Sequence, residues 1–246
     1  MTPTTDIRIG CAGWSIPKPH AAHFPPDGSH LERYARRFGT VEINSSFYNP
    51  HRPTTYARWA ETVPAAFQFA VKVPRTITHT RRLAGVETEL ESFLAEVTSL
   101  GTKLGPLLVQ LPPGLAFDHT VADRFFSTLR ERFDGDVVCE PRHATWFSPE
   151  ADALLAAWQV ARVAADPALM PEAAQPGGWD GIVYYRLHGS PRIYYSTYDT
   201  NYLDVLARTL AQHAARRVPA WCIFDNTAES AATANPLYLL NHLAQA

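Results

Sequence analysis

Short apolar runs alternate along this chain with longer stretches of helical character. The short runs predict β-strands at Ile7–Gly13, Thr40–Phe47, Gln68–Pro74, Pro106–Pro112, Asp136–Arg142, Val160–Asp166, Gly181–His188 and Pro219–Asn226. The longer stretches predict helices near Leu31–Phe38, Thr55–Thr62, Val86–Leu100, Val121–Phe133, Pro149–Trp158, Tyr202–Arg216 and Glu229–Ala244. Strands that alternate with helices indicate parallel pairing through crossover helices.

Eight such units predict an α/β fold, a (β/α)8 TIM-type barrel with parallel strands, as a single domain over residues 1–246. One helix is expected to be missing, because Pro167–Asp180, between the sixth and seventh strands, is rich in proline and glycine. The connections after strands one, three and seven are long: Trp14–His30, Arg75–Gly85 and Gly189–Asn201. Barrel enzymes build their active sites from such loops, at the C-terminal ends of the strands.

Polar residues share one face of five predicted strands, while apolar residues share the other. Because side chains alternate along a strand, the apolar sets should meet the helices and the polar sets should point into the barrel. The polar sets include Glu42, Asn44 and Ser46, then Lys72, Gln110, Glu140 with Arg142, and Arg186 with His188. Burying charge is costly, so this pattern favours a binding or catalytic pocket. The alternative is a self-contained ion network, with Glu42 paired to Lys72 and Glu140 paired to Arg142 or Arg186.

Four of these residues are candidate catalytic groups. We expect Glu42 and Lys72 to form a charged pair at the floor of the pocket, and Glu140 and His188 to act as acid and base. Lys72, one of only three lysines, is a candidate general base, electrostatic clamp or Schiff-base amine. The competing interpretations are a buried lysine that is simply paired and a core histidine bonded to a carboxylate.

Other residues at the same end of the strands suit binding of an anion. Arginines grip anions and flat rings stack on substrates, and Gly189–Ser190 with Asn226 resembles the phosphate site of many barrels. Ordinary packing aromatics and a helix N-cap are the competing interpretations. The candidate substrate-binding residues are Trp14, Asn44, Ser46, His79, Gln110, Arg142, Arg186 and Asn226.

Composition narrows the class of protein. The chain is 46% hydrophobic and 19% charged with a formal net charge of −2, which excludes disorder and disfavours general nucleic-acid coating. No apolar run is long enough for a membrane helix, and the polar segment Met1 to Asp6 carries no signal-peptide pattern, so we expect a cytoplasmic protein with no membrane partner. Cys11, Cys139 and Cys222 lie far apart and are expected to be buried structural thiols.

A divalent metal is kept as an alternative, although no cofactor is predicted. Glu140, His143, Asp166, His188 and Asp225 include enough oxygen and nitrogen ligands for one ion. No short ligand motif supports such a site.

Several motifs, taken together in one order, resemble a known family. They are Gly10-Cys11-Ala12-Gly13-Trp14, Glu42-Ile43-Asn44-Ser45-Ser46-Phe47-Tyr48, Phe69 to Pro74 with Ile77-Thr78-His79, Gln110-Leu111-Pro112-Pro113, Glu140-Pro141-Arg142-His143 with Trp146, and Arg186-Leu187-His188-Gly189. The chain thereby resembles the YecE-like family, a bacterial and archaeal domain of unknown function. The resemblance implies a TIM-type barrel and no settled activity. The final motif of similar sequences is Tyr followed by Phe-Asn-Asn. In this chain the same motif is Trp221-Cys222-Ile223-Phe224-Asp225-Asn226.

Three functional hypotheses follow. The first is an enzyme that acts by acid–base chemistry on a small anionic substrate, a phosphorylated sugar or nucleotide. The second, from a more distant similarity to sugar isomerases and abasic-site endonucleases, is a metal-dependent nucleic-acid phosphodiesterase, which the net charge disfavours. The third is a non-catalytic barrel that binds a metabolite.

Overall fold

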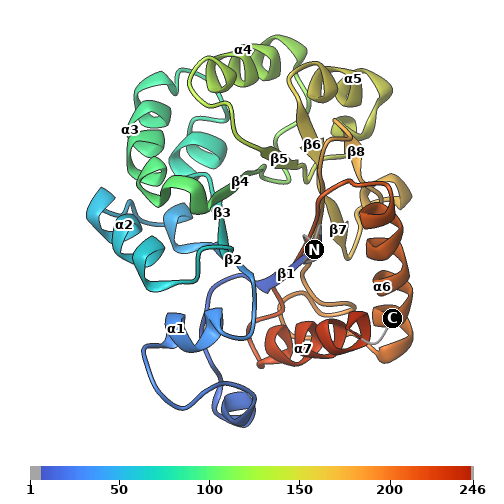
Figure 1. Cartoon of the computed structure of the whole chain (residues 1–246). Helices are drawn as coiled ribbons and strands as arrows, with labels where there is room; N and C mark the ends of the chain where they lie inside the picture. The colour runs from blue at the N-terminus through green and yellow to red at the C-terminus, as the bar shows by residue number, and fades with distance from the viewer. Residues whose placement is uncertain (1–6, 245–246) are drawn as a thin grey trace.

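Parallel strands lie at the centre of the molecule, and α-helices surround them in the computed structural model, which describes residues 7–244 (Figure 1). The strands are β1 (Ile7–Cys11), β2 (Thr40–Ile43), β3 (Gln68–Lys72), β4 (Leu104–Gln110), β5 (Val137–Glu140), β6 (Val160–Arg162), β7 (Ala164–Asp166), β8 (Gly177–Gly178), β9 (Val183–Leu187) and β10 (Ala220–Phe224). The helices are α1 (His30–Ala35), α2 (Pro53–Thr62), α3 (Glu87–Val97), α4 (His119–Arg130), α5 (Pro149–Ala157), α6 (Thr200–Ala215) and α7 (Ala231–Leu243). The polar segment at residues 1–6 lies outside the described residues.

The strands pair in two sheets. One has the order β1-β10-β9-β7 and is parallel throughout, and the other has the order β2-β3-β4-β5-β6-β8, in which only β8 is antiparallel. A parallel bridge between Ala12 and Glu42 joins β1 to β2. The predicted sixth strand is divided: β6 pairs with β5, and β7 pairs with β9. The fold is therefore α/β with mostly parallel strands.

The two faces of the strands separate as the alternation predicts. Val41, Val71 and Val109 pack with helical residues in the core outside the strands, and Cys139 lies on that same side. The inward face carries its own apolar cluster, which includes Ala70, Leu108, Val138, Tyr184, Trp221 and Ile223. Gly105 leaves room for the indole of Trp221, because a Cβ atom there would lie 2.6 Å from the ring. The inner cluster thus fills the beginning of the strands and leaves their C-terminal ends for polar residues.

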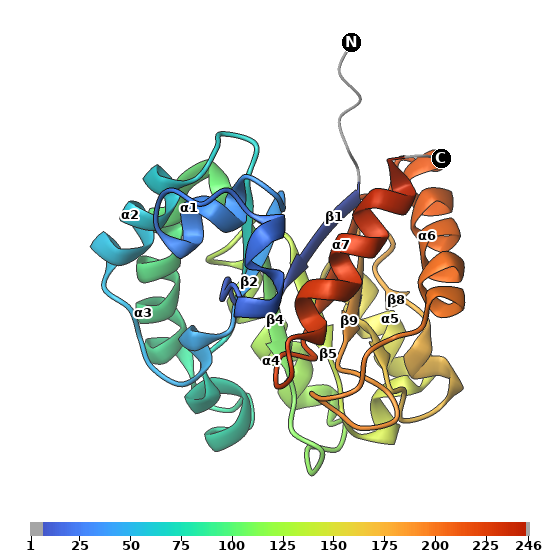
Figure 2. The ribbon, with the colours of Figure 1, turned by 90° about the horizontal axis from the view of Figure 1, so that it is seen from below.

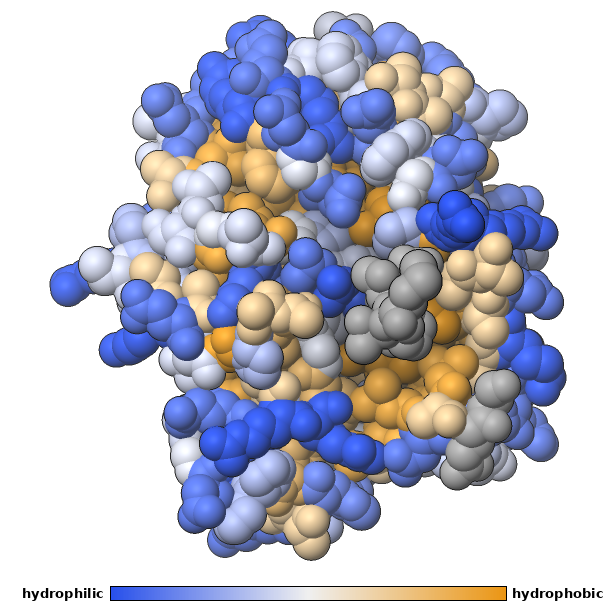
Figure 3. All heavy atoms as spheres, in the orientation of Figure 1, coloured by the Kyte–Doolittle hydropathy of each residue, from blue (hydrophilic) through white to orange (hydrophobic). Residues whose placement is uncertain are grey.

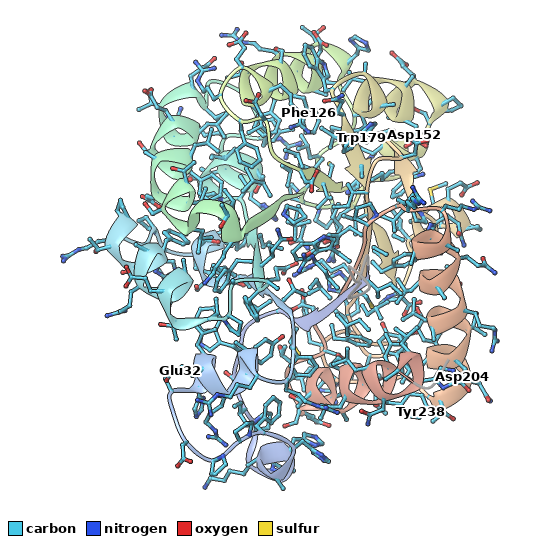
Figure 4. The ribbon with its side chains drawn as sticks, viewed as in Figure 1. Glu32, Phe126, Asp152, Trp179, Asp204 and Tyr238 are labelled. Carbon is cyan, nitrogen blue, oxygen red and sulfur yellow. The ribbon has the colours of Figure 1, made fainter. Side chains whose placement is uncertain are left out.

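The helices turn polar faces outward and bury apolar ones (Figure 3). Figure 2 shows α1, α2 and α3 on one side of the strands and α6 and α7 on the other. Side chains also join neighbouring helices: Tyr238 on α7 donates a 2.9 Å hydrogen bond to Asp204 on α6 (Figure 4). No helix between Ile7 and Ala244 combines the length and apolar character needed to cross a membrane.

Three predicted segments differ from the observed elements. The second strand ends at Ile43, and a 3-10 helix (Ser45–Phe47) follows, so Asn44 and Ser46 do not continue the strand alternation. Its turn is held by the Ser46 hydroxyl, which donates to the carbonyls of Ile43 and Lys72. The C-terminal part of the predicted third helix, after Val97, is a 3-10 helix (Thr98–Lys103). In the segment Pro167–Asp180, where no α-helix was expected, the structure has a short 3-10 helix (Pro171–Ala174) and β8.

Candidate functional site

Charged side chains from neighbouring strands meet at the C-terminal ends of the strands. Glu42, Lys72, Gln110 and Glu140 come from β2, β3, β4 and β5 respectively, and Arg186 comes from β9. Two more lie just beyond a strand: His188 after β9 and Asp225 after β10. All seven are buried, since parallel strands bring their C-terminal ends to the same side of the fold.

Arg186 is the centre of this cluster. Its Nε and Nη2 atoms donate to the carboxylate of Glu42 at 2.7–3.2 Å, and Nη1 donates to Oε2 of Glu140 at 3.2 Å. The Nη2 atom also lies 3.0 Å from Oδ2 of Asp225. Burial alone would lower the pKa of the guanidinium group, but the three surrounding carboxylates raise it well above its usual range. Arg186 is therefore a permanent buried cation.

The expected pairing of Glu42 with Lys72 is wrong. Glu42 binds Arg186, and the hydroxyl of Tyr184 donates to its Oε2 atom at 2.8 Å. The reason is geometric: a planar guanidinium matches both oxygens of a carboxylate, whereas an ammonium is a point charge. Of the two partners proposed for Glu140, both are present, because Arg142 and Arg186 each contact it.

Glu140 is the most heavily hydrogen-bonded carboxylate of the cluster. Oε2 accepts from Gln110 at 2.9 Å, and Oε1 accepts from Nε and Nη2 of Arg142 at 3.0 and 2.7 Å. Burial by itself would raise its pKa, but Arg186, His188 and Arg142 together hold that pKa well below its usual range. Glu140 is thus an ionised acceptor that orients cations.

His188 has partners for two protonation arrangements. Its Nδ1 atom lies 3.1 Å from Oδ2 of Asp225, and its Nε2 atom lies 2.9 Å from Oε1 of Glu140 and 3.0 Å from Nη2 of Arg142. When both ring nitrogens carry protons they donate to the two carboxylates. When only Nδ1 does, Nε2 accepts from Arg142. His188 therefore links Asp225 to the pair formed by Glu140 and Arg142.

Lys72 differs from every other cation in the cluster. Lys72 is only 5% exposed, and its Nζ atom lies 4.0 Å from the centroid of the Phe47 ring. Within residues 7–244 the ammonium has no hydrogen bond and no carboxylate within 4.0 Å. Burial, and then the charge of Arg186, lower its pKa to about 8, although the charges of Glu42, Glu140 and Asp225 act to raise it. Lys72 is thus a buried amine without the direct carboxylate contacts that hold the arginines of the cluster.

Two hollows adjoin the cluster. A groove of about 810 Å³ is lined by Phe47, Arg75, Arg81 and residues of α3, and the Phe47 ring also contacts the Lys72 ammonium. A smaller cavity of about 320 Å³ is lined by Arg142 and His188 together with apolar residues. His79 lies near the cluster as well: burial lowers its pKa, as do the nearby charges of Lys72, Arg75 and Arg142.

Three other predicted binding residues, Trp14, Ser46 and Asn226, have contacts of their own within the fold. Trp14 packs edge-on against Trp59, with 5.0 Å between ring centroids, and Ser46 holds the turn after β2. Asn226 is fully buried and donates to the Ser196 carbonyl and to Asn235. The Oδ1 atom of Asn226 has no partner among the described residues, and the N–H of Gly189 donates to the hydroxyl of Tyr198. Asn44 is half-buried, with an Oδ1 atom that has no partner among the described residues.

Alternation along the strand places Tyr184 on the same inward face as Arg186, two positions before it, but sequence reasoning gave it no role at the site. Asp225 was proposed only as a metal ligand. Asp225 follows β10, whose Phe224 is in register with Leu187 of β9. That register brings Asp225 to Arg186, and the register of two strands could not be predicted from the sequence.

The proposed metal ligands have other partners. Across residues 7–244 no group of three His, Cys, Asp or Glu side chains has the arrangement of a metal site. Glu140 and Asp225 accept from arginines, Asp166 accepts from Tyr198, and His143 contacts Thr145. Cys11, Cys139 and Cys222 are free and buried, and burial raises the pKa of Cys11 to about 12.

Comparison with known proteins assigns the chain to a family. The family described as "Protein of unknown function DUF72" matches residues 8–246. The chain belongs to the DUF72 family. Among curated DUF72 relatives, the UPF0759 protein YecE of Escherichia coli K12 is 34% identical over 143 residues, which are 58% of this chain and 50% of that protein. The UPF0759 protein YunF of Bacillus subtilis 168 is 31% identical over 154 residues, 58% of this chain and 53% of that protein.

The chain therefore spans about half the length of the curated DUF72 relatives it matches. Solved structures are similar over more of the chain. A DUF72 family protein from Enterococcus faecalis V583 covers 97% of this chain and 95% of its own, with a TM-score of 0.81 and 21% identity. A DUF72 family protein from Thermotoga maritima MSB8 covers 97% and 99%, with a TM-score of 0.78 and 22% identity. The resemblance seen in the motifs is confirmed, and the α/β fold is that of DUF72 structures.

Proposed function

We propose that this chain is an enzyme that binds a small anionic substrate at the C-terminal ends of its strands and transfers a proton through Lys72. The observation that carries the proposal is the Lys72 ammonium, which is buried against Phe47 with no carboxylate partner among the described residues. A buried charge without a partner is costly, and an anionic ligand would supply one. A pKa of about 8 places proton exchange in the range that general acid–base catalysis uses.

The architecture behind this proposal is a closed (β/α)8 TIM-type barrel with its site at the usual end. Two contacts between the sheets support closure: the bridge between Ala12 and Glu42, and the continuous segment from β6 to β7. In such a barrel the inner apolar cluster is the floor, and the charged cluster is the mouth.

The charges of the cluster favour an anion over a cation. The carboxylates of Glu42, Glu140 and Asp225 are all occupied by Arg186, Arg142 or His188. The remaining cationic donors are Lys72 and the Nη1 atom of Arg142, which has no hydrogen-bond partner within residues 7–244. Arg142 keeps 26% of its side chain exposed, so it is the cation that an incoming anion meets first.

These contacts divide the roles. Lys72 holds and moves the proton, with His188 as the second candidate acid or base and Arg142 as the anion-binding group. We assign Glu42 and Glu140 to positioning, because both are fully buried and hydrogen-bonded to Arg186. Glu140, with its depressed pKa, would be a poor proton donor at neutral pH.

Anion binding is tested by calorimetric titration with sulfate at low ionic strength. We expect Lys72→Met to weaken sulfate binding at least tenfold, because the ligand loses a buried charge partner. Lys18→Met, an exposed lysine on the loop after β1, is the matched control and should bind as the natural protein does. Equal affinities in the natural protein and Lys72→Met would overturn the proposal.

Catalysis is tested separately, with small anions extracted from cells and incubated in D2O with the protein. We expect an anion to be converted or to take up deuterium with the natural protein, and Lys72→Met to leave it unchanged. If sulfate binding depends on Lys72 but no extracted anion changes, the proposal that the chain is an enzyme is overturned. A barrel that binds a metabolite would then remain.

A further inference from the structure

We propose that the substrate of this site carries a compact apolar group, an aromatic ring or a branched hydrocarbon, which binds in the cavity beside His188 and Arg142. We call this hollow the apolar cavity. It is lined by Pro113, Pro141, Arg142, Ala165, Pro167, Ala168, Leu169, Ala173, His188 and Ile193. The inference rests on the proposed anion site and adds the chemistry of the other half of the substrate.

The residues that line the apolar cavity determine which chemical groups it can bind favourably. Arg142 and His188 are its only side chains with hydrogen-bonding groups, and the other eight are proline, alanine, leucine or isoleucine. A sugar brings several hydroxyl groups that would lose water here without gaining partners, which costs free energy for each group. A ring or a branched hydrocarbon has no hydrogen bonds to water to lose, and it gains contact with the apolar walls. Of the two substrate classes predicted from sequence, a phosphorylated sugar is therefore disfavoured.

The apolar cavity and the charged cluster share two residues. Arg142 donates to Glu140 in the cluster and also lines the cavity. His188 contacts Asp225 on one side and lines the cavity on the other. A ligand whose anionic group binds Arg142 would thus place its next few atoms in the apolar cavity. The volume of about 320 Å³ lies at the small end of ligand sites and suits a single ring.

The outer wall provides a second, independent observation. Leu169 and Ile193 both line the apolar cavity and are 57% and 40% exposed, so two large apolar side chains are open to solvent at one hollow. They come from two different loops, after β7 and after β9, which meet at this hollow. A bound ring would cover both.

The wall is also held in place. Arg162 donates to the carbonyls of Glu172 and Gln175 and pairs with Asp152 on α5, which anchors the segment that carries Leu169 and Ala173. Pro141 and Pro167 also line the cavity, and their rings restrict the backbone there. A pre-formed wall of this kind lowers the cost of ordering upon binding.

The experiment compares anions that differ only in the apolar group. The probes are phenyl phosphate against inorganic phosphate, and benzoate against acetate, titrated by calorimetry at one pH and one ionic strength. We expect the ring to tighten binding at least tenfold within one pair, and the preferred pair identifies the anionic group. Glycerol 3-phosphate should bind no better than inorganic phosphate.

Variants locate the effect. The double substitution Leu169→Ser with Ile193→Ser should remove the gain from the ring and leave inorganic phosphate or acetate binding unchanged. Val205→Ser is the matched control, because Val205 is 54% exposed on α6 and does not line the apolar cavity. All three positions are exposed enough for the variants to fold, and circular dichroism verifies it.

Two results would overturn the inference in distinguishable ways. Equal binding of ringed and ringless anions, or a ring effect that survives the double substitution, would reject the apolar cavity and keep the anion site. If none of the anions binds, the proposed function fails and the inference fails with it.

Discussion

Arg186 shows how a single residue organises this site. It is fully buried and contacts Glu42, Glu140 and Asp225, so three carboxylates in the interior depend on one guanidinium. Burying such a group adds little net stability compared with apolar packing, yet removing one partner leaves uncompensated charge behind. Loss of Arg186 would therefore leave three buried carboxylates without one of their cationic partners.

Replacing Arg186 should be severely destabilising. We expect Arg186→Met to lower the free energy of unfolding by about 3 to 5 kcal/mol, measured by urea denaturation at pH 7. The natural protein should lose stability as the pH falls below about 4.5, since the depressed pKa values of Glu140 and Asp225 stabilise the fold only while both are ionised. Arg186→Met should lack this loss and gain stability on acidification. A variant with the stability and acid sensitivity of the natural protein would contradict the role of Arg186.

The sequence predicted the members of the cluster better than their partners. Alternation along a strand is a local property, so Glu42, Lys72, Glu140 and Arg186 could be placed on the inward face. Which carboxylate meets which cation depends on contacts between residues far apart in the chain, such as the 144 positions that separate Glu42 from Arg186. That is why the pairing of Glu42 with Lys72 was wrong and the unpaired state of Lys72 was not foreseen.

At the scale of elements, the segment between β7 and β9 replaces a helix with an anchored loop. Its proline and glycine content predicted that no helix would form there. The anchor was not predictable, because it depends on Arg162 reaching Asp152 on α5 and two carbonyls of the loop. Gly177 packs against this guanidinium, since a Cβ atom there would lie 2.2 Å from its Nη2 atom. The second strand is a similar case: the turn held by Ser46 ends it earlier than its alternation predicts.

Removing the anchor should loosen the loop selectively. We expect Arg162→Met to lower the free energy of unfolding by about 2 to 3 kcal/mol and to increase hydrogen exchange across residues 164–178. Arg124→Met is the control, because its pair with Glu87 is exposed and should contribute less than about 1 kcal/mol. Unchanged exchange in this segment, or an equal effect of the two variants, would show that Arg162 does not anchor it.

At the scale of the whole molecule, parallel strands concentrate charge at one end of a nearly neutral protein. The formal net charge is −2, and the inner cluster of apolar residues leaves the C-terminal strand ends to the charged cluster. The order of strands and helices predicted the α/β class, and the match to DUF72 structures confirms it. Lys72 lies in the charged cluster with cations near it and no carboxylate at contact distance. The central claim of the account is that its pKa is therefore lowered.

The most direct test is to titrate Lys72 itself. The chain has only three lysines, so after ¹³C-methylation each gives a separable NMR signal, and Lys72→Arg identifies the one from Lys72. We predict that Lys72 titrates near pH 8 and that sulfate raises this pKa, because a bound anion stabilises the charged amine. By linkage, sulfate should bind more weakly as the pH rises through 8. A Lys72 signal that titrates at the ordinary value of 10.5 and does not respond to sulfate would contradict the account.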